Sequence, residues 1–336
     1  MSVPVAWRPS QERIQRATLT RFATWLRESR GLAVDGYDEL WRWSVTDLEG
    51  FWSAIVAFFS LRFAAGGEVV LGDRSMPGSQ WFPGARISYA EHIFRDRDPG
   101  AVAIRSRSEV RPELDAWTWG RLRDETARIA GGLAALGVGE GDRVVAYMPN
   151  IPETVAAFFA CASLGAVWSA AAPEFGVRSV VDRFAQVAPK VLLAVDGYRY
   201  GGRDFHRSES VEQIAQQLPG LERVVRLGYL DGGGWEPGFL RERELSFAAP
   251  AFDHPLWILY SSGTTGLPKA IVHSQGGILL EHVKKLHLHV DAQAGDRLFW
   301  FTTTGWMMWN FLVGSMLVGG VPVLYDGSPG HPSLDV

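Results

Sequence analysis

From about residue 101 onward, short apolar runs alternate with segments that have helical spacing. Runs such as RVVAYM, KVLLAVD and VPVLYD are apolar at almost every position, which is typical of strands buried on both faces of a sheet. The segments VRSVVDRFAQVA and SVEQIAQQL place an apolar residue every three or four positions, as an amphipathic helix does. This alternation predicts an α/β fold with parallel-rich sheets flanked by helices.

The first 95 residues differ from the rest, because they are rich in tryptophan and have helical rather than strand-like patterns. Ser10 is placed to cap a helix that stops near Gly31, and Thr46 with Glu49 has the spacing of a capping box. We therefore expect a helical region at 1–95 that covers a larger domain at 96–336.

Composition limits the possible partners. The chain has 336 residues, is 47% apolar and carries a net charge of -4 without basic runs, which argues against nucleic acid or an anionic membrane as the main partner. The apolar stretches 154–172 and 307–325 are interrupted by polar residues, Gly and Pro, so we expect buried core rather than membrane spans. A single cysteine, Cys161, and a start without a signal-peptide pattern lead us to expect a cytoplasmic protein.

The most informative motif is YSSGTTGLPK at residues 260–269, directly after an apolar strand. Glycines let the backbone approach a ligand closely, and successive amides with hydroxyl side chains can surround phosphate oxygens. Lys269 adds a positive charge that can reach a phosphate. The spacing differs from the common P-loop, which has four residues between Gly and Gly-Lys-Ser/Thr, whereas only two separate Gly263 from Gly266 here.

The motif resembles the phosphate loop of the adenylate-forming superfamily, which includes acyl-CoA synthetases. The resemblance implies that the loop handles the β- and γ-phosphates of ATP and that Lys269, Thr264 and Thr265 take part in catalysis. The matching positions implied to bind ATP are Ser261, Ser262, Gly263, Thr264, Thr265, Gly266 and Lys269.

A second motif, WFTTTGWMMWNFLVG at 300–314, reads as a strand, a Thr-rich turn and an aromatic helix. Its large side chains fit plain core packing, but they also fit the wall of a small acid pocket. The residues expected to line that pocket are Trp306, Met307, Met308 and Trp309. A pocket walled by such side chains favours short acids, although shape alone discriminates by only about 1–3 kcal/mol per methylene.

The same segment, with HSQGGILLEHVKKLHLHVD before it and VLYDGSPGHP after it, resembles the acetoacetyl-CoA synthetases. The leading region, with WRWSVTDLEGFW and WFPGARISYAEH, is also similar to theirs. The resemblance implies a ligase that uses ATP, Mg²⁺ and CoA to activate a short-chain keto acid through an acyl-adenylate. By the same likeness, Phe175, Gly176, Arg199 and Arg203 would bind CoA.

Alternatives remain open. Acetate or propionate could replace acetoacetate, or the chain could be a non-catalytic paralogue that binds a nucleotide. A P-loop ATPase is a third reading, but Asp196 precedes the loop and is wrongly placed for it. The motifs for adenine and Mg²⁺, for ribose and for the mobile lysine that the resemblance implies are expected beyond Val336, so we expect this stretch alone not to complete adenylation. His282, His287 and His289 lie in one segment that we expect to be helical, and it has no metal-binding pattern, so we expect no metal ligands from them.

Overall fold

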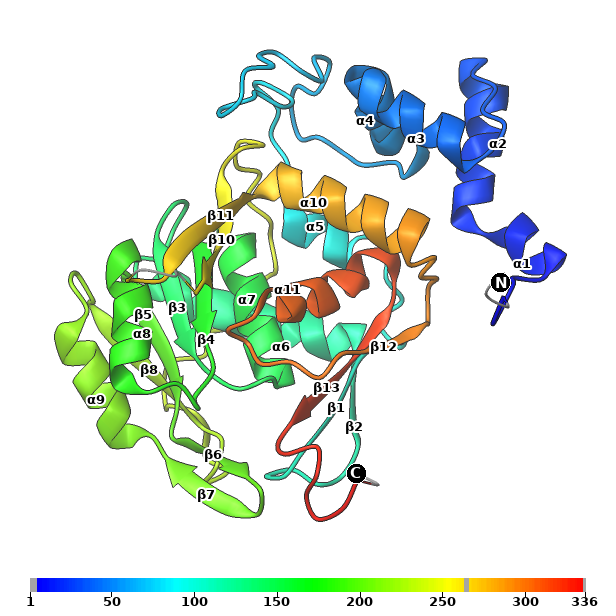
Figure 1. Cartoon of the computed structure of the whole chain (residues 1–336). Coiled ribbons are helices and arrows are strands. Elements are labelled where there is room, and N and C mark those ends of the chain that lie inside the picture. Colours follow the sequence, from blue (N-terminus) through cyan, green and yellow to red (C-terminus); the bar gives the residue numbers. More distant parts are fainter. Residues whose placement is uncertain (1–4, 263–265, 335–336) are drawn as a thin grey trace.

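A computed structural model describes residues 5–262 and 266–334. Its largest element is a seven-stranded sheet (Figure 1). In spatial order the strands are β11 (Lys269–Ser274), β10 (Pro255–Ser261), β4 (Val167–Ala171), β3 (Arg143–Tyr147), β5 (Val191–Val195), β8 (Arg223–Gly228) and β9 (Gly234–Trp235). The five central strands are parallel, and the two edge strands are antiparallel to their neighbours. The predicted α/β fold with parallel-rich sheets is confirmed.

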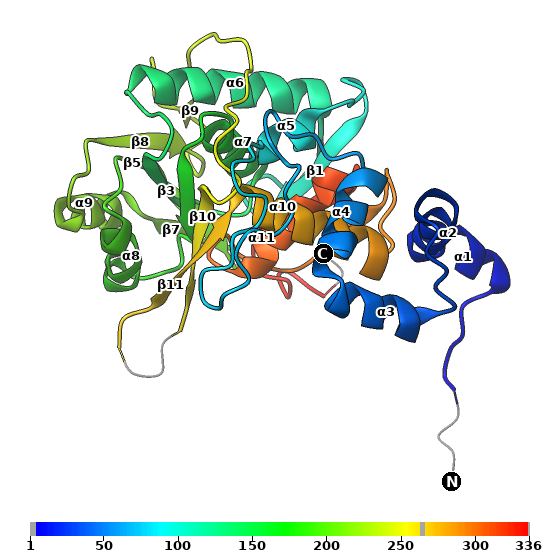
Figure 2. The same ribbon diagram turned by 90° about the horizontal axis from the view of Figure 1, so that it is seen from above.

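Helices cover both faces of this sheet, which explains why its central strands are apolar throughout. Val145 and Tyr147 of β3 pack in one cluster with α8 (Val177–Phe184) and α9 (Ser208–Gln217). Val144 and Ala146 face the opposite way, toward α6 (Trp119–Ala135) and α7 (Pro152–Ser163). Figure 2 shows the two helix layers on either side of the strands. Consecutive side chains of a strand point to opposite faces, so neither face of β3 can be polar.

A smaller four-stranded sheet lies beside the first. Its strands, in order, are β12 (Arg297–Phe299), β13 (Val321–Asp326), β1 (Val102–Ser108) and β2 (Asp115–Thr118). A separate hairpin is formed by β6 (Gly197–Tyr200) and β7 (Arg203–His206). The division into two sheets could not be read from the order of elements, because β1 pairs with β13 across most of the chain.

Four helices form the N-terminal layer: α1 (Gln11–Arg16), α2 (Thr18–Arg30), α3 (Tyr37–Thr46) and α4 (Leu48–Phe58). The short α5 (Tyr89–Phe94) follows after an irregular segment. The layer contacts α10 (Gln275–Lys284) and the π-helical turn η2 (Lys285–His289). Figures 1 and 2 both show α4 beside α10. The Thr18 amide donates to Asp291 Oδ1 at 2.8 Å, and the Phe59 ring stacks on His287.

The length of one predicted helix and the cap of another need correction. Ser10 does cap α1, accepting from the Arg13 amide, but the helix breaks at Ala17 and a second one runs on to Arg30. The side chain that caps α4 belongs to Asp47, not to Thr46.

Helix α7 begins after Asn150, with Ile151 as its N-cap and Pro152 in the first turn. The Asn150 amide oxygen is engaged elsewhere, as described below. Proline at the first position of α7 has no N–H to be capped, so this helix can begin without a side-chain cap.

Both long apolar stretches are buried core, as predicted. The first contains α7 and β4, whose residues are almost all buried. The second contains α11 (Met307–Gly314), the short turn η3 (Ser315–Val318) and β13. No helix among the described residues is both long enough and apolar enough to span a bilayer.

Candidate active site

The predicted phosphate loop connects β10 to β11 at one edge of the large sheet. Ser261 ends β10 and lies opposite Lys269, the first residue of β11. Ser262, Gly266 and Lys269 are exposed at this open end. The backbone of Gly266 has a φ of 151°, which an L side chain rarely adopts. Gly263, Thr264 and Thr265 lie outside the described residues.

Both ends of the loop are tied to helix α8 and the turn η1 (Ala185–Val187) after it. The Tyr260 hydroxyl donates to the Arg183 carbonyl at 2.8 Å, and the Gln186 amide donates to the Pro268 carbonyl at 2.9 Å. Burial raises the pKa of Tyr260 to about 12, so its hydroxyl stays protonated and keeps donating at neutral pH. The described flanks of the loop are thus held in place by neighbouring elements.

A cavity of about 430 Å³ lies where the two sheets approach each other. Aromatic side chains form much of its wall, and these are Phe175, Tyr198, Tyr200, Phe205, Phe301, Trp306 and Tyr325. Its polar groups come from the strand ends and the turn before α11, namely Asn150, Glu174, Thr302, Thr303 and Asp326. An apolar cavity with a few convergent polar groups is the usual form of a small-molecule site.

The four residues predicted to line an acid pocket lie in different surroundings in the structure. Trp306 lines the cavity and is 61% exposed. Met307 is 49% exposed and Met308 is half-buried, and neither belongs to the cavity wall. Trp309 is fully buried, and its indole N–H donates to Asn150 Oδ1 at 2.9 Å. The surroundings of Trp309 are therefore those of a core residue.

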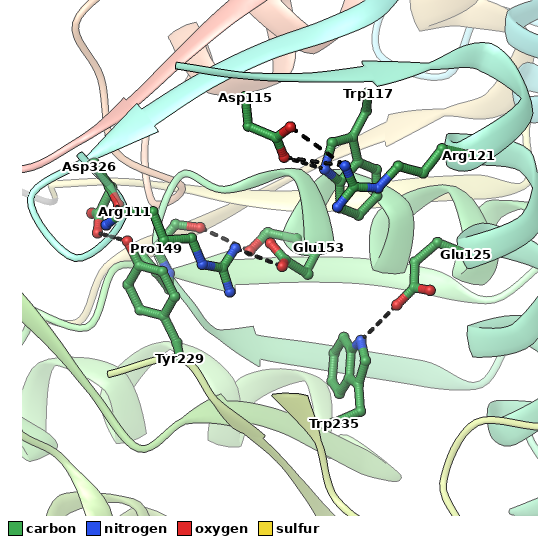
Figure 3. Close-up of polar contacts among 12 residues, drawn as sticks. Arg111, Asp115, Trp117, Arg121, Glu125, Pro149, Glu153, Tyr229, Trp235 and Asp326 are labelled. Atoms are coloured by element: carbon green, nitrogen blue, oxygen red, sulfur yellow. Dashed lines mark hydrogen bonds and ion pairs between the residues drawn. The ribbon is translucent and has the colours of Figure 1, made fainter. Parts of the chain in front are cut away.

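Asp326, at the end of β13, is the polar residue that sequence reasoning missed. It is 6% exposed, and its Oδ2 accepts a hydrogen bond from the Tyr229 hydroxyl at 2.9 Å. Burial, together with the nearby carboxylate of Glu174, raises the pKa of Asp326 to about 7. Figure 3 shows this pair beside the ion pair of Arg111 with Glu153. No local motif marks Asp326, because its partner lies on a different sheet.

The four residues that resemble CoA ligands fall in two places. Phe175 lines the 430 Å³ cavity, and Gly176 is the N-cap of α8. Arg199 lines a second, more polar cavity of about 390 Å³ that also contains Arg107 and His331.

Arg199 and Arg203 both lie on the β6–β7 hairpin. The Arg199 guanidinium contacts both oxygens of Asp204, at 2.5 and 3.1 Å. Arg203 is exposed at the start of β7. Tyr325 lines both cavities and so marks where they adjoin.

Two of the histidines in α10 and η2, His282 and His287, have structural partners. His282 is buried and its Nδ1 lies 3.0 Å from the Tyr89 hydroxyl. Burial lowers the pKa of His282 to about 3 and that of His287 to about 4, so both are neutral at pH 7. Within residues 5–262 and 266–334, no group of three or more His, Cys, Asp or Glu could hold a metal ion.

With this geometry in view, comparison with known proteins defines the class. The model for AMP-binding enzymes matches residues 94–335, and that for the acetyl-coenzyme A synthetase N-terminus matches residues 37–93. The chain belongs to the AMP-binding enzyme family.

Within that family it is similar to acetoacetyl-CoA synthetases, as the sequence predicted. It is 39% identical to the acetoacetyl-coenzyme A synthetase of Rhizobium meliloti (strain 1021), covering 98% of this chain and 52% of the relative. The enzyme of Macaca fascicularis is 36% identical, with 99% and 52% covered. The structure of acetoacetyl-CoA synthetase from Streptomyces lividans matches with a TM-score of 0.93 and 50% identity, over 98% of this chain and 52% of that one. The chain thus spans about half the length of these relatives.

Proposed function

We propose that this chain contributes to an ATP-dependent acid–thiol ligase that converts acetoacetate and CoA to acetoacetyl-CoA, with AMP and pyrophosphate as the other products. The similarity to acetoacetyl-CoA synthetases over nearly the whole chain is the observation that carries the proposal. Residues 1–95 would act as a supporting helical region, and 96–336 as the part that binds nucleotide.

In the first step, a carboxylate oxygen of the acid attacks the α-phosphorus of ATP, and pyrophosphate leaves. Ser261, Ser262, Gly266 and Lys269 would hold the β- and γ-phosphates, together with Gly263, Thr264 and Thr265, which lie outside the described residues. The Lys269 ammonium is exposed at the loop and can reach a phosphate. Mg²⁺ would bridge the triphosphate oxygens, because in such sites it is held by one or two carboxylates together with substrate phosphates.

In the second step, the CoA thiol attacks the acyl carbon and AMP leaves. The acid and the thiol arm of CoA would bind in the aromatic cavity at Phe175 and Trp306. This cavity suits them because it is mostly apolar and has hydroxyl groups at its edge. The polar cavity at Arg199 supports a place for the phosphates of CoA, since guanidinium groups suit phosphate binding. Arg203, exposed on the same hairpin, could reach the same ligand. The chemistry is mainly positioning and stabilisation of developing phosphate charge.

The choice of acid rests on the relatives rather than on the cavity. The malonamoyl-CoA synthetase of Penicillium aethiopicum is also similar, at 33% identity. Its name and those of the acetoacetyl enzymes both describe short acids with a second carbonyl. We therefore place acetoacetate ahead of acetate or propionate.

ATP–pyrophosphate exchange tests the proposal. In a ligase that contains this chain, acetoacetate should support faster exchange than acetate or butyrate. Exchange supported equally by acetate would favour an acetate or propionate ligase, and nucleotide binding without any exchange would favour a non-catalytic paralogue. The 336-residue chain by itself is expected to show no exchange, and robust exchange by it would contradict that expectation.

A further inference from the structure

The carboxylate of Glu109 joins three segments that are far apart in sequence. Glu109 follows the end of β1, and its own amide donates to the Asp326 carbonyl at 3.0 Å. Oε1 accepts from the Gly201 amide at 2.9 Å and from the Ser328 amide at 2.7 Å. Oε2 accepts from the Gly202 amide at 2.7 Å. One side chain therefore fixes the tip of the β6–β7 hairpin and the loop after β13 to the end of β1 (Figure 1).

The backbone around Glu109 is shaped for this contact. Gly201 and Gly202 have φ of 60° and 74°, and positive φ at both central residues is what a tight hairpin turn requires. A Cβ on Gly202 would lie 2.8 Å from the His331 ring, and one on Gly327 would lie 2.7 Å from Glu109 Cγ. Neither position has room for a side chain, so the close approach depends on glycine.

The hairpin needs such a tether at its tip. A two-stranded hairpin alone is at best marginally stable in water, and β6 pairs only with β7 among the described strands. Its base is held separately, because the Asp196 carboxylate accepts the amides of Tyr229, Leu230 and Asp231. Glu109 is the corresponding anchor for the tip, where Arg199 and Arg203 lie on either side of the turn.

The contact also sets the position of Arg199. The Arg199 guanidinium reaches the Glu109 carbonyl at 3.4 Å, in addition to Asp204. Burial opposes ionisation of Glu109, but the hydrogen bonds from three backbone amides outweigh it, so the pKa of Glu109 is lowered and its carboxylate stays negatively charged. Fixing the hairpin therefore also fixes where the Arg199 guanidinium lies in the polar cavity.

We propose that Glu109 is a positioning residue that holds the β6–β7 hairpin so that Arg199 and Arg203 can bind the phosphates of CoA. This rests on the proposed function for the ligand, whereas the clamp itself rests on the hydrogen bonds above. Glutamine cannot replace Glu109, because its NH₂ group would face either the Gly202 amide or the two amides at Oε1.

The test compares Glu109→Gln and Glu109→Ala with Glu113→Gln, which removes the same charge from an exposed residue of the same β1–β2 connection. Amide hydrogen exchange is measured by mass spectrometry, and CoA binding by calorimetry. Both Glu109 variants should exchange at least about tenfold faster at residues 200–203 and 328, with β3 and β5 unchanged as a check of folding. Their Kd for CoA should rise about tenfold, which corresponds to ~1.4 kcal/mol of lost preorganisation.

Unchanged exchange at the hairpin tip would overturn the clamp, and a looser tip with unchanged CoA affinity would overturn its role in binding. The same shifts in Glu113→Gln would attribute them to charge alone and also count against the proposal. If the wild-type chain bound no CoA, the proposed function would fail at this site and the ligand role of Glu109 with it. Hydrogen exchange would then still decide whether the clamp exists.

Discussion

The Tyr229 hydroxyl donates a 2.9 Å hydrogen bond to Asp326, and this bond joins the ends of strands from two different sheets. Tyr229 directly follows β8 of the large sheet, and Asp326 is the last residue of β13 in the small one. The Arg111 guanidinium lies over the Tyr229 ring, 4.9 Å from its centre, and pairs with Glu153. Both partners of the hydrogen bond are buried, so the contact between sheets is sensitive to the charge on Asp326.

Replacing Tyr229 with Phe should destabilise the fold, because a buried carboxylate loses a hydrogen-bond donor. We expect the free energy of unfolding to fall by about 1–3 kcal/mol. The loss should be larger at pH 8 than at pH 5, since hydrogen bonds to ionised acceptors are the stronger ones. Urea denaturation measures it, with Tyr37→Phe as the control because Tyr37 is 61% exposed. An equal effect of the two substitutions would contradict the prediction.

Asp326 should make stability depend on pH near neutrality. Its pKa is raised from 3.8 to about 7 by burial, so the folded state binds the proton more tightly than the unfolded state. The stabilising contribution is full below about pH 4 and is lost as the pH rises through about 7. The slope can reach ~1.4 kcal/mol per pH unit for one group. Asp326→Asn removes this titration, so its stability relative to wild type should improve from pH 4.5 to pH 8. A difference that stays constant with pH would refute this.

Substitution of Trp309 should mainly lower stability, whereas substitution of Trp306 should mainly change acid binding, although both residues lie on one short segment. Trp309→Ala should cost about 3–5 kcal/mol of unfolding free energy, because Trp309 is fully buried and hydrogen-bonded to Asn150. Trp306→Ala should cost less than about 1 kcal/mol, since Trp306 is mostly exposed. Trp306→Ala should instead change the relative binding of acetoacetate and butyrate. Thermal denaturation and acid-dependent exchange together measure both effects, and comparable stability losses would be the contrary outcome.

Lys269→Ala should weaken ATP binding by about 10- to 100-fold, the factor for losing a charged hydrogen bond worth ~1.5–3 kcal/mol. Stability should hardly change, because Lys269 is exposed at the first position of β11. Lys284→Ala is the matched control, since Lys284 lies over the Trp52 ring in the N-terminal layer. Calorimetric titration with MgATP measures the affinity. Equal affinity in the two variants would remove Lys269 from the proposed phosphate site.

Local patterns predicted the elements of the large sheet well. The runs that form β3, β4 and β5 are apolar because helices cover both faces of the sheet. This apolar pattern can be recognised in the sequence even when the covering helices are not known. Gly137, just after α6, has a φ of 76°, as a glycine that follows a helix C-terminus commonly does. Helix starts were less certain, because several residues near Asp47 and Ile151 could fill the same role.

The candidate site was only partly visible in the sequence. The phosphate loop could be recognised because all its groups are contiguous. Asp326 and Glu109 carry no such signal, because each depends on partners about one hundred or more residues away, such as Tyr229 and Ser328. Trp306 and Trp309 look alike in sequence, and only the turn before α11 decides which of them faces the cavity.

The parallel pairing of β1 with β13 sets a delay during synthesis. Arg105 of β1 lies opposite Val323 of β13, so β1 waits for a partner that leaves the ribosome some two hundred residues later. At about 5–20 residues per second, this takes roughly 10–40 s. Throughout that interval β1 can pair with β2 on one edge. The main-chain groups of its other edge can bond only to solvent or to a chaperone until β13 is made.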